Sequence, residues 1–104
     1  MASKHEIEMD FRRAKEQAQK LEEAANALNT LSKNKFNGTL QLIANSWKGD
    51  SASLYLKKGT TLQNEMTGTA NELKSIASDI REIARRIYEA EMRNLERARH
   101  RHHH

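Results

Sequence analysis

Apolar residues recur along the first half of the chain at alternating steps of four and three residues. Such spacing averages about 3.5 residues, the repeat of a helix that packs lengthwise on another helix. Ser3 and Glu6 have the spacing of a capping box, so we expect the helix to begin near residue 4. The apolar stripe consists of Ile7, Phe11, Ala14, Ala18, Leu21, Ala25, Leu28, Ser32, Phe36, Leu40, Ile43 and Trp47.

The first stripe contains two extra steps of four, from Ser32 to Phe36 and on to Leu40. An insertion of this kind locally unwinds a supercoil without ending the helix. Asn37 and Gly38 together are also a turn signal. We predict one helix over about residues 4–45, with a bend in this segment as the expected irregularity.

A second stripe steps by threes and fours through Ala52, Tyr55, Gly59, Leu62, Met66, Thr69, Leu73, Ile76, Ile80, Ile83 and Ile87. On the opposite face, Glu82 and Glu89 each precede an arginine by four residues, which predicts the surface pairs Glu82 with Arg86 and Glu89 with Arg93. The stripe fades past Met92. We predict a helix over about residues 51–97 and a basic, histidine-bearing tail over 98–104.

Between the stripes lies a break. Asn45 and Ser46 continue a helix poorly, and Gly49 can adopt the left-handed conformation that ends one. Asp50 or Ser51 can cap the next helix. These residues predict a tight turn over 46–50 between two antiparallel helices.

Two expectations follow from this hairpin. Trp47 is in phase with the first stripe, so we expect its ring to be buried at the tip. Gly38 and Gly59 are about equally far from the turn, so we expect them to face each other and to let the backbones approach closely. The alternative is that both glycines are merely tolerated, each at a cost of about 1 kcal/mol relative to alanine.

The predicted fold is all-α: a single domain over residues 1–104, formed by an antiparallel two-helix hairpin. Two helices cannot hide an apolar stripe from water on all sides, and the chain has no cysteine to form a disulfide. We therefore predict that two hairpins, identical or different, pair into a coiled-coil-like four-helix bundle dimer. The expected core and dimer contacts are Leu21, Leu28, Leu40, Ile43, Tyr55, Leu62, Leu73, Ile80, Ile83 and Ile87.

Composition agrees with long two-faced helices, because charged residues make up 31% of the chain and proline is absent. The apolar runs are too short to span a membrane. The N-terminal residues lack the apolar core of a cleavable signal peptide, so any export is expected to use another machine.

The stretch SWKGDSASLY, with Trp47, Lys48 and Gly49 at its centre, resembles the signature of the WXG family of small type VII secretion substrates. Ala52 and Tyr55 match the small residue and the aromatic residue that follow in that family. The resemblance covers nearly the whole chain as architecture, but as a motif only residues 47–55. It implies a helical hairpin that forms homodimers or heterodimers. It also implies export from a Gram-positive bacterium, without a cleavable signal peptide, by an FtsK/SpoIIIE-type ATPase.

Many members of the family carry a C-terminal export signal, Tyr-x-x-x-Asp/Glu. Here Tyr88 is suitably placed, but the fourth residue after it is Met92, and the nearby acids are Glu89 and Glu91. One interpretation is that Tyr88 and Glu91 form an imperfect signal. Another is that a partner supplies it, as for an accessory protein that pairs with the helical domain of an LXG-type toxin. A third is that Tyr88 is an ordinary exposed helix residue.

We find no catalytic constellation, no phosphate loop and no spaced metal ligands, so we expect neither an enzyme nor a cofactor. The histidines at positions 100 and 102–104 are interpreted as a purification tag or its remnant, with metal binding as the alternative. The net charge is +4, and arginines concentrate toward the C-terminus. A basic nucleic-acid-binding helix is therefore an alternative function, but glutamates interrupt the basic patch and we expect no nucleic-acid partner.

Overall fold

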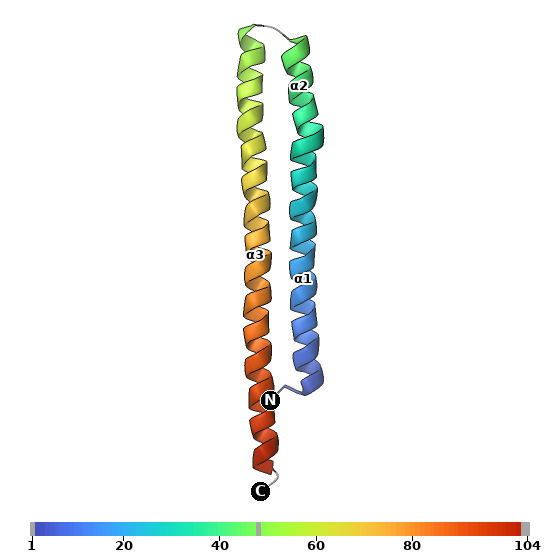
Figure 1. Cartoon of the computed structure of the whole chain (residues 1–104), viewed down its shortest axis with the longest axis vertical. Coiled ribbons are helices and arrows are strands. Elements are labelled where there is room, and N and C mark those ends of the chain that lie inside the picture. The colour runs from blue at the N-terminus through green and yellow to red at the C-terminus, as the bar shows by residue number, and fades with distance from the viewer. Residues whose placement is uncertain (1, 48, 103–104) are drawn as a thin grey trace. The chain divides into compact units, whose positions relative to one another are not determined.

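The computed structural model describes residues 2–47 and 49–102. Its helices are α1 (Lys4–Thr30), the π-helical segment η1 (Leu31–Phe36), α2 (Asn37–Ser46) and α3 (Asp50–His102), as Figure 1 shows. Among the described residues only Ala2, Ser3, Trp47 and Gly49 lie outside a helix, and none lies in a strand. The all-α prediction and its helical-hairpin character are therefore confirmed.

The chain divides into two compact units. The terminal unit joins residues 1–21 with residues 75–104, so it pairs the beginning of α1 with the end of α3. The turn unit is residues 22–74, and it pairs the rest of α1, η1 and α2 with the beginning of α3. Within each unit the two segments run antiparallel.

The first helix begins where its cap predicts. The N–H of Glu6 donates to Ser3 Oγ at 3.2 Å, and the N–H of Ile7 donates to the Ser3 carbonyl at 3.0 Å. These bonds satisfy two of the donors that a helix start leaves open. At the other end, α3 continues to His102, past the predicted end near residue 97. His103 and His104 lie outside the described residues.

The phase shift of the first stripe is absorbed by η1. The N–H of Asn37 donates to the carbonyls of Asn34 and Ser32, and the second bond spans five residues, as in a π-helix. The helical path therefore continues through Asn37 and Gly38 without a turn. Here the sequence interpretation was right about continuity, while the irregularity takes the form of a π-helical segment.

Small residues fill the closest contacts between the paired segments. The buried residues are Ile7, Ala18 and Ala77 in the terminal unit, and Ala25, Ser32, Ala52 and Ala70 in the turn unit. Positions 18, 25 and 32 repeat every seven residues, as do positions 70 and 77. Alanine and serine at a helix contact let the two backbones approach closely. The sequence reading had placed larger residues at the centre of this contact.

Much of the predicted stripe is only half-buried or exposed. Tyr55, Leu62, Ile83 and Ile87 are 55%, 46%, 56% and 52% exposed, so they are not covered within the single chain, and their role as dimer contacts stays a prediction. Along α3 the stripe positions 52, 59, 66, 73 and 80 are buried or half-buried, whereas positions 55, 62, 76, 83 and 87 are exposed. The other predicted stripe residues are half-buried: Leu21, Leu28, Leu40, Ile43, Leu73 and Ile80.

The turn forms as predicted in its backbone. Trp47 leaves the helix with φ −105° and ψ 144°, and Gly49 has a φ of 99°, in the left-handed region that favours glycine. Lys48 lies outside the described residues. Asp50 is the first residue of α3 rather than its cap, one position earlier than predicted, and its carboxylate favours the positive end of the helix dipole.

Two expectations about packing near the turn were wrong. The Trp47 side chain is 52% exposed, so its ring is not buried at the tip. Gly59 packs against Leu40 and not against Gly38, whose surroundings are open. The π-helical segment changes the phase of the residues that follow it, so Leu40 replaces Gly38 on the contact face.

Candidate interaction sites

The turn displays a pair of aromatic side chains. The rings of Trp47 and Tyr55 lie with centroids 5.7 Å apart at an interplanar angle of 84°, an edge-to-face contact. Each side chain keeps more than half of its surface exposed. Trp47 ends the path of α2, and Tyr55 lies in the second turn of α3, so the extended backbone at Trp47 and the positive φ of Gly49 bring the two rings together. Large aromatic groups held rigidly at a surface are typical anchors for a partner protein.

Within each unit, exposed apolar residues of α3 recur at a seven-residue spacing. Tyr55, Leu62, Ile76 and Ile83 are separated by multiples of seven residues, and each is about half exposed. We call these four residues the α3 stripe. A seven-residue repeat of exposed branched and aromatic side chains is the seam that one helix offers to another. The turn unit contributes Tyr55 and Leu62, and the terminal unit contributes Ile76 and Ile83.

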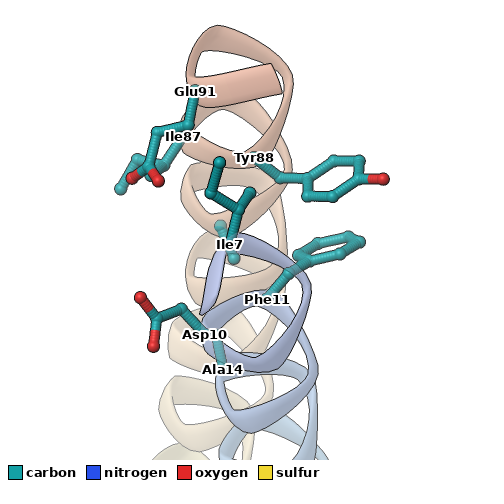
Figure 2. Close-up of a pocket in the computed structure, with 8 residues that line it drawn as sticks. Ile7, Asp10, Phe11, Ala14, Ile87, Tyr88 and Glu91 are labelled. Carbon is teal, nitrogen blue, oxygen red and sulfur yellow. The ribbon is translucent and has the colours of Figure 1, made fainter. Parts of the chain in front are cut away.

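A pocket of about 260 Å³ opens between α1 and α3 in the terminal unit (Figure 2). Its lining is mostly apolar and consists of Ile7, Asp10, Phe11, Ala14, Ala84, Ile87, Tyr88 and Glu91. The rings of Phe11 and Tyr88 stack at its side, with centroids 4.6 Å apart and planes 18° from parallel. We call this the terminal pocket.

Two carboxylates, those of Asp10 and Glu91, lie on the same side of the terminal pocket, opposite the aromatic stack (Figure 2). Neither forms an ion pair or a side-chain hydrogen bond within the part of the chain that the structure describes. The terminal pocket therefore combines an apolar lining with two carboxylates that no described side chain neutralises. Sequence reasoning missed Asp10 and Phe11 as site residues. The antiparallel pairing of the two ends was the signal that could have placed them beside Tyr88.

The structure separates the two residues of the imperfect export signal. The Tyr88 ring is held against Phe11, whereas the Glu91 carboxylate points to the opposite side of the pocket (Figure 2). Both residues line the same cavity, on opposite sides of it. The interpretation of Tyr88 as an ordinary exposed residue is not met either, because its ring is packed and the residue is only partly exposed. Whether Tyr88 and Glu91 act in export stays a prediction.

A network of charges covers the outer face of α3 in the terminal unit. Arg85 donates to Glu82 at 2.6 Å and to Glu89 at 2.9 Å, and Arg86 donates to Glu82 at 3.0 Å. The pair of Glu82 with Arg86 is thus confirmed, while Glu89 contacts Arg85 instead of Arg93. The hydrogen bond from Arg85 lowers the pKa of Glu82, and the same bond raises the pKa of Arg85.

The last turns of α3 present unpaired cations. Arg93, Arg97, Arg99 and Arg101 are exposed, and none has an ion pair or hydrogen bond within the described ranges. A shallow pocket lined by Met92, Arg93, Glu96 and Arg97 lies along this end. His100 approaches Glu96 at 3.8 Å. This end of the helix is therefore basic at its surface, with little internal compensation.

Within residues 2–47 and 49–102, no three histidine or acidic side chains gather in a way that could hold a metal ion. None of the described helices combines the length and the apolar character needed to cross a membrane.

Comparisons with known proteins identify no relative: no family model matches the chain, and neither a curated protein nor a solved structure was found to be similar to it. The resemblance to the WXG family therefore rests on residues 47–55 and on the helical-hairpin character of the chain.

Proposed function

We propose that this chain is a non-enzymatic substrate or export partner of a type VII secretion system, and that it acts by pairing with a second helical protein. The pairing surface is the α3 stripe, and the surface that the export machinery reads is the turn around Trp47 and Gly49. The partner is another copy of the chain or a related helical protein. The exporting enzyme is an ATPase of the FtsK/SpoIIIE type.

The observation that carries this proposal is the exposure of Trp47. A tryptophan whose only role was to stabilise the hairpin would be covered, because burying a large aromatic ring stabilises a fold by several kcal/mol. Here the ring remains 52% exposed and is oriented by Tyr55 and by the turn backbone. Both aromatic residues of the WXG-like motif thus contribute to one rigid surface.

The α3 stripe supports the pairing part of the proposal. Isoleucine and leucine side chains are exposed on α3 at a seven-residue repeat. Burying them against a partner is favourable, because each Å² of apolar surface removed from water contributes about 25 cal/mol. A monomeric protein seldom exposes several large apolar side chains at a regular helical spacing without a partner for them. Covering them with a second pair of helices gives a four-helix bundle.

The second candidate is an accessory protein that pairs with the helical domain of an LXG-type toxin. The packing of Tyr88 favours it. An export signal must be accessible, yet the Tyr88 ring stacks on Phe11, and position 92 holds methionine where the family has an acid. In this candidate the partner supplies the signal, and the chain supplies its turn and the α3 stripe.

Export by a Gram-positive host that carries this chain and a type VII system tests the proposal. We expect the chain in the culture medium, its loss from the medium when the ATPase is deleted, and its loss when Trp47 is changed to alanine. Leu42→Ala is the matched control, because Leu42 is 64% exposed and lies near the turn but outside the motif. A cytoplasmic marker protein monitors lysis.

Normal export of the Trp47→Ala protein, or export that does not depend on the ATPase, would contradict the proposal. Deletion of a neighbouring toxin gene separates the two candidates. A self-sufficient substrate is still exported without the toxin, whereas an accessory protein stays in the cell.

A further inference from the structure

The lining of the terminal pocket is suited to bind a long cationic side chain. The apolar lining includes Ile7, Ala84 and Ile87. Asp10 and Glu91 supply two carboxylates on one side of the pocket (Figure 2). An arginine fits both features, because its methylene stem covers apolar surface while its guanidinium group donates to carboxylates. Two carboxylates beside one cation also match the several donors of a guanidinium group.

Two nearby cations of the terminal unit, Lys15 and Arg85, are already engaged. Lys15 Nζ lies 4.4 Å from the centroid of the Phe11 ring, so that ammonium group takes part in a cation–π contact. Arg85 is held by Glu82 and Glu89. The charges of Asp10 and Glu91 are therefore not compensated by these neighbours.

The uncompensated cations of the terminal unit include those on the last turns of α3. Figure 1 shows that these turns continue past the start of α1, so they lie beside no other helix of the unit. Arg93 and Arg97 are exposed there and have no partner within the described residues. Neither lines the pocket of its own chain, and two residues along a helix turn Arg93 to the side of α3 away from Glu91.

We propose that the terminal pocket binds Arg93 or Arg97 from a second copy of this chain, so that two copies associate through their terminal units. The contact is reciprocal, because each copy has the terminal pocket and the arginines at the same end. This is the arrangement of an isologous two-fold interface. Charge complementarity selects this occupant: the unpaired carboxylates line the pocket, and the unpaired arginines protrude just beyond it.

This association is distinct from pairing along the α3 stripe and does not rest on the proposed export function. It uses mostly polar and charged groups at the protein surface, where each ion pair contributes little and salt screens it. We therefore expect weak association that is present at low ionic strength and lost at high ionic strength. Pairing along the stripe is apolar and persists in both conditions.

Exchanging the charges tests the proposal. One variant of the full chain carries Asp10→Lys with Glu91→Lys, and the other carries Arg93→Glu with Arg97→Glu. Sedimentation equilibrium at about 50 and about 500 mM NaCl measures the salt-sensitive step of association. We expect each variant alone to raise the dissociation constant of that step about tenfold or more, and a mixture of the two to restore it.

The matched control is Arg12→Glu with Arg13→Glu, which makes the same change of charge on exposed residues of α1 in the same unit. We expect this control to associate like the wild-type chain. Circular dichroism verifies that all variants keep their helical content. A wild-type chain with no salt-sensitive step, or variants whose mixture does not recover it, would overturn the proposal.

Failure of this proposal is distinguishable from failure of pairing along α3. Loss of only the salt-sensitive step in the charge variants supports the contact between terminal units. If the control loses that step as well, the association depends on overall charge and not on the terminal pocket, and the proposal is wrong.

Discussion

Leu40 packs directly against Gly59 where α2 and α3 lie side by side in the turn unit, and a methyl group at Gly59 would overlap Leu40 Cδ2. The absent side chain of Gly59 therefore provides the space that Leu40 occupies. No such contact exists at Gly68, also on α3, where an added methyl group would meet open space. One helix thus contains a glycine that is needed for packing and a glycine that is not.

The first prediction concerns these two glycines. Replacing glycine by alanine inside a helix gains about 1 kcal/mol from the backbone, and we expect Gly68→Ala to raise the free energy of unfolding by about 0.5–1 kcal/mol. In Gly59→Ala the displacement of Leu40 costs about 1–3 kcal/mol, so this change lowers stability or leaves it unimproved. Urea unfolding at fixed protein concentration measures both. Equal stabilisation by the two changes would show that Gly59 is merely tolerated.

A second prediction concerns the polar contact beside η1. Gln63 Nε2 donates to the Ser32 carbonyl at 2.9 Å, while the buried Ser32 hydroxyl has no hydrogen-bond partner among the described residues. We expect Gln63→Met to lower the free energy of unfolding by up to about 1 kcal/mol, because the Ser32 carbonyl loses one of its two donors and keeps only the N–H of Asn37. Ser32→Ala removes the unpaired hydroxyl, so we expect it to raise stability by about 0.5–1 kcal/mol.

Thermal unfolding of the two single variants and of the double variant measures these effects. If Ser32→Ala is destabilising, the hydroxyl has a partner in solution. The description of the Ser32 hydroxyl as an unpaired buried group would then be wrong.

The third prediction concerns the aromatic pair at the turn. Trp47 and Tyr55 are in edge-to-face contact, a geometry worth about 0.5–1.5 kcal/mol beyond the burial of area. A double-mutant cycle with Trp47→Ala and Tyr55→Ala should show a coupling energy of this size. Coupling near zero would mean that the two rings move independently in solution and do not form a rigid surface.

The fourth prediction concerns pH. The hydrogen bond from Arg85 lowers the pKa of Glu82 from its ordinary 4.5. A lowered pKa in the folded state stabilises the fold above pH 4.5, and that contribution is lost as the pH falls through the lowered value. We expect carbon NMR of the Glu82 carboxyl group to show a midpoint below 4.5, and Arg85→Gln to move it upward. Arg86→Gln is the comparison and should move it less, since the hydrogen bond from Arg85 is the largest cause of the shift.

The elements of this fold could be predicted because heptads, capping residues and a glycine turn are local signals. Ser3 begins α1 and Gly49 adopts its positive φ, as their residue types indicate. The exact contact face could not be predicted in the same way. Ala70 and Ala77 are buried although the predicted stripe does not include them, because the contact face depends on where small side chains let the backbones approach.

The two candidate sites differ in the same way, because the sequence indicates one of them and not the other. The motif at Trp47 was visible in the sequence, but the exposure of its ring was not. No local sequence signal predicts the terminal pocket. Phe11 and Tyr88 are far apart in the sequence, and only the pairing of the two chain ends stacks their rings.

The central claim is that the α3 stripe is a pairing surface. Light scattering at about 500 mM NaCl, where contacts between surface charges are screened, gives the solution mass of the full chain. The test variant is Ile76→Glu with Ile83→Glu. The control is Asn71→Glu with Ser78→Glu, which places the same charges on exposed positions of the opposite face of α3. We predict that the wild-type chain and the control are dimers and that the stripe variant is a monomer. A cooperatively folded wild-type monomer, or a dimer that the stripe variant leaves intact, would contradict the account.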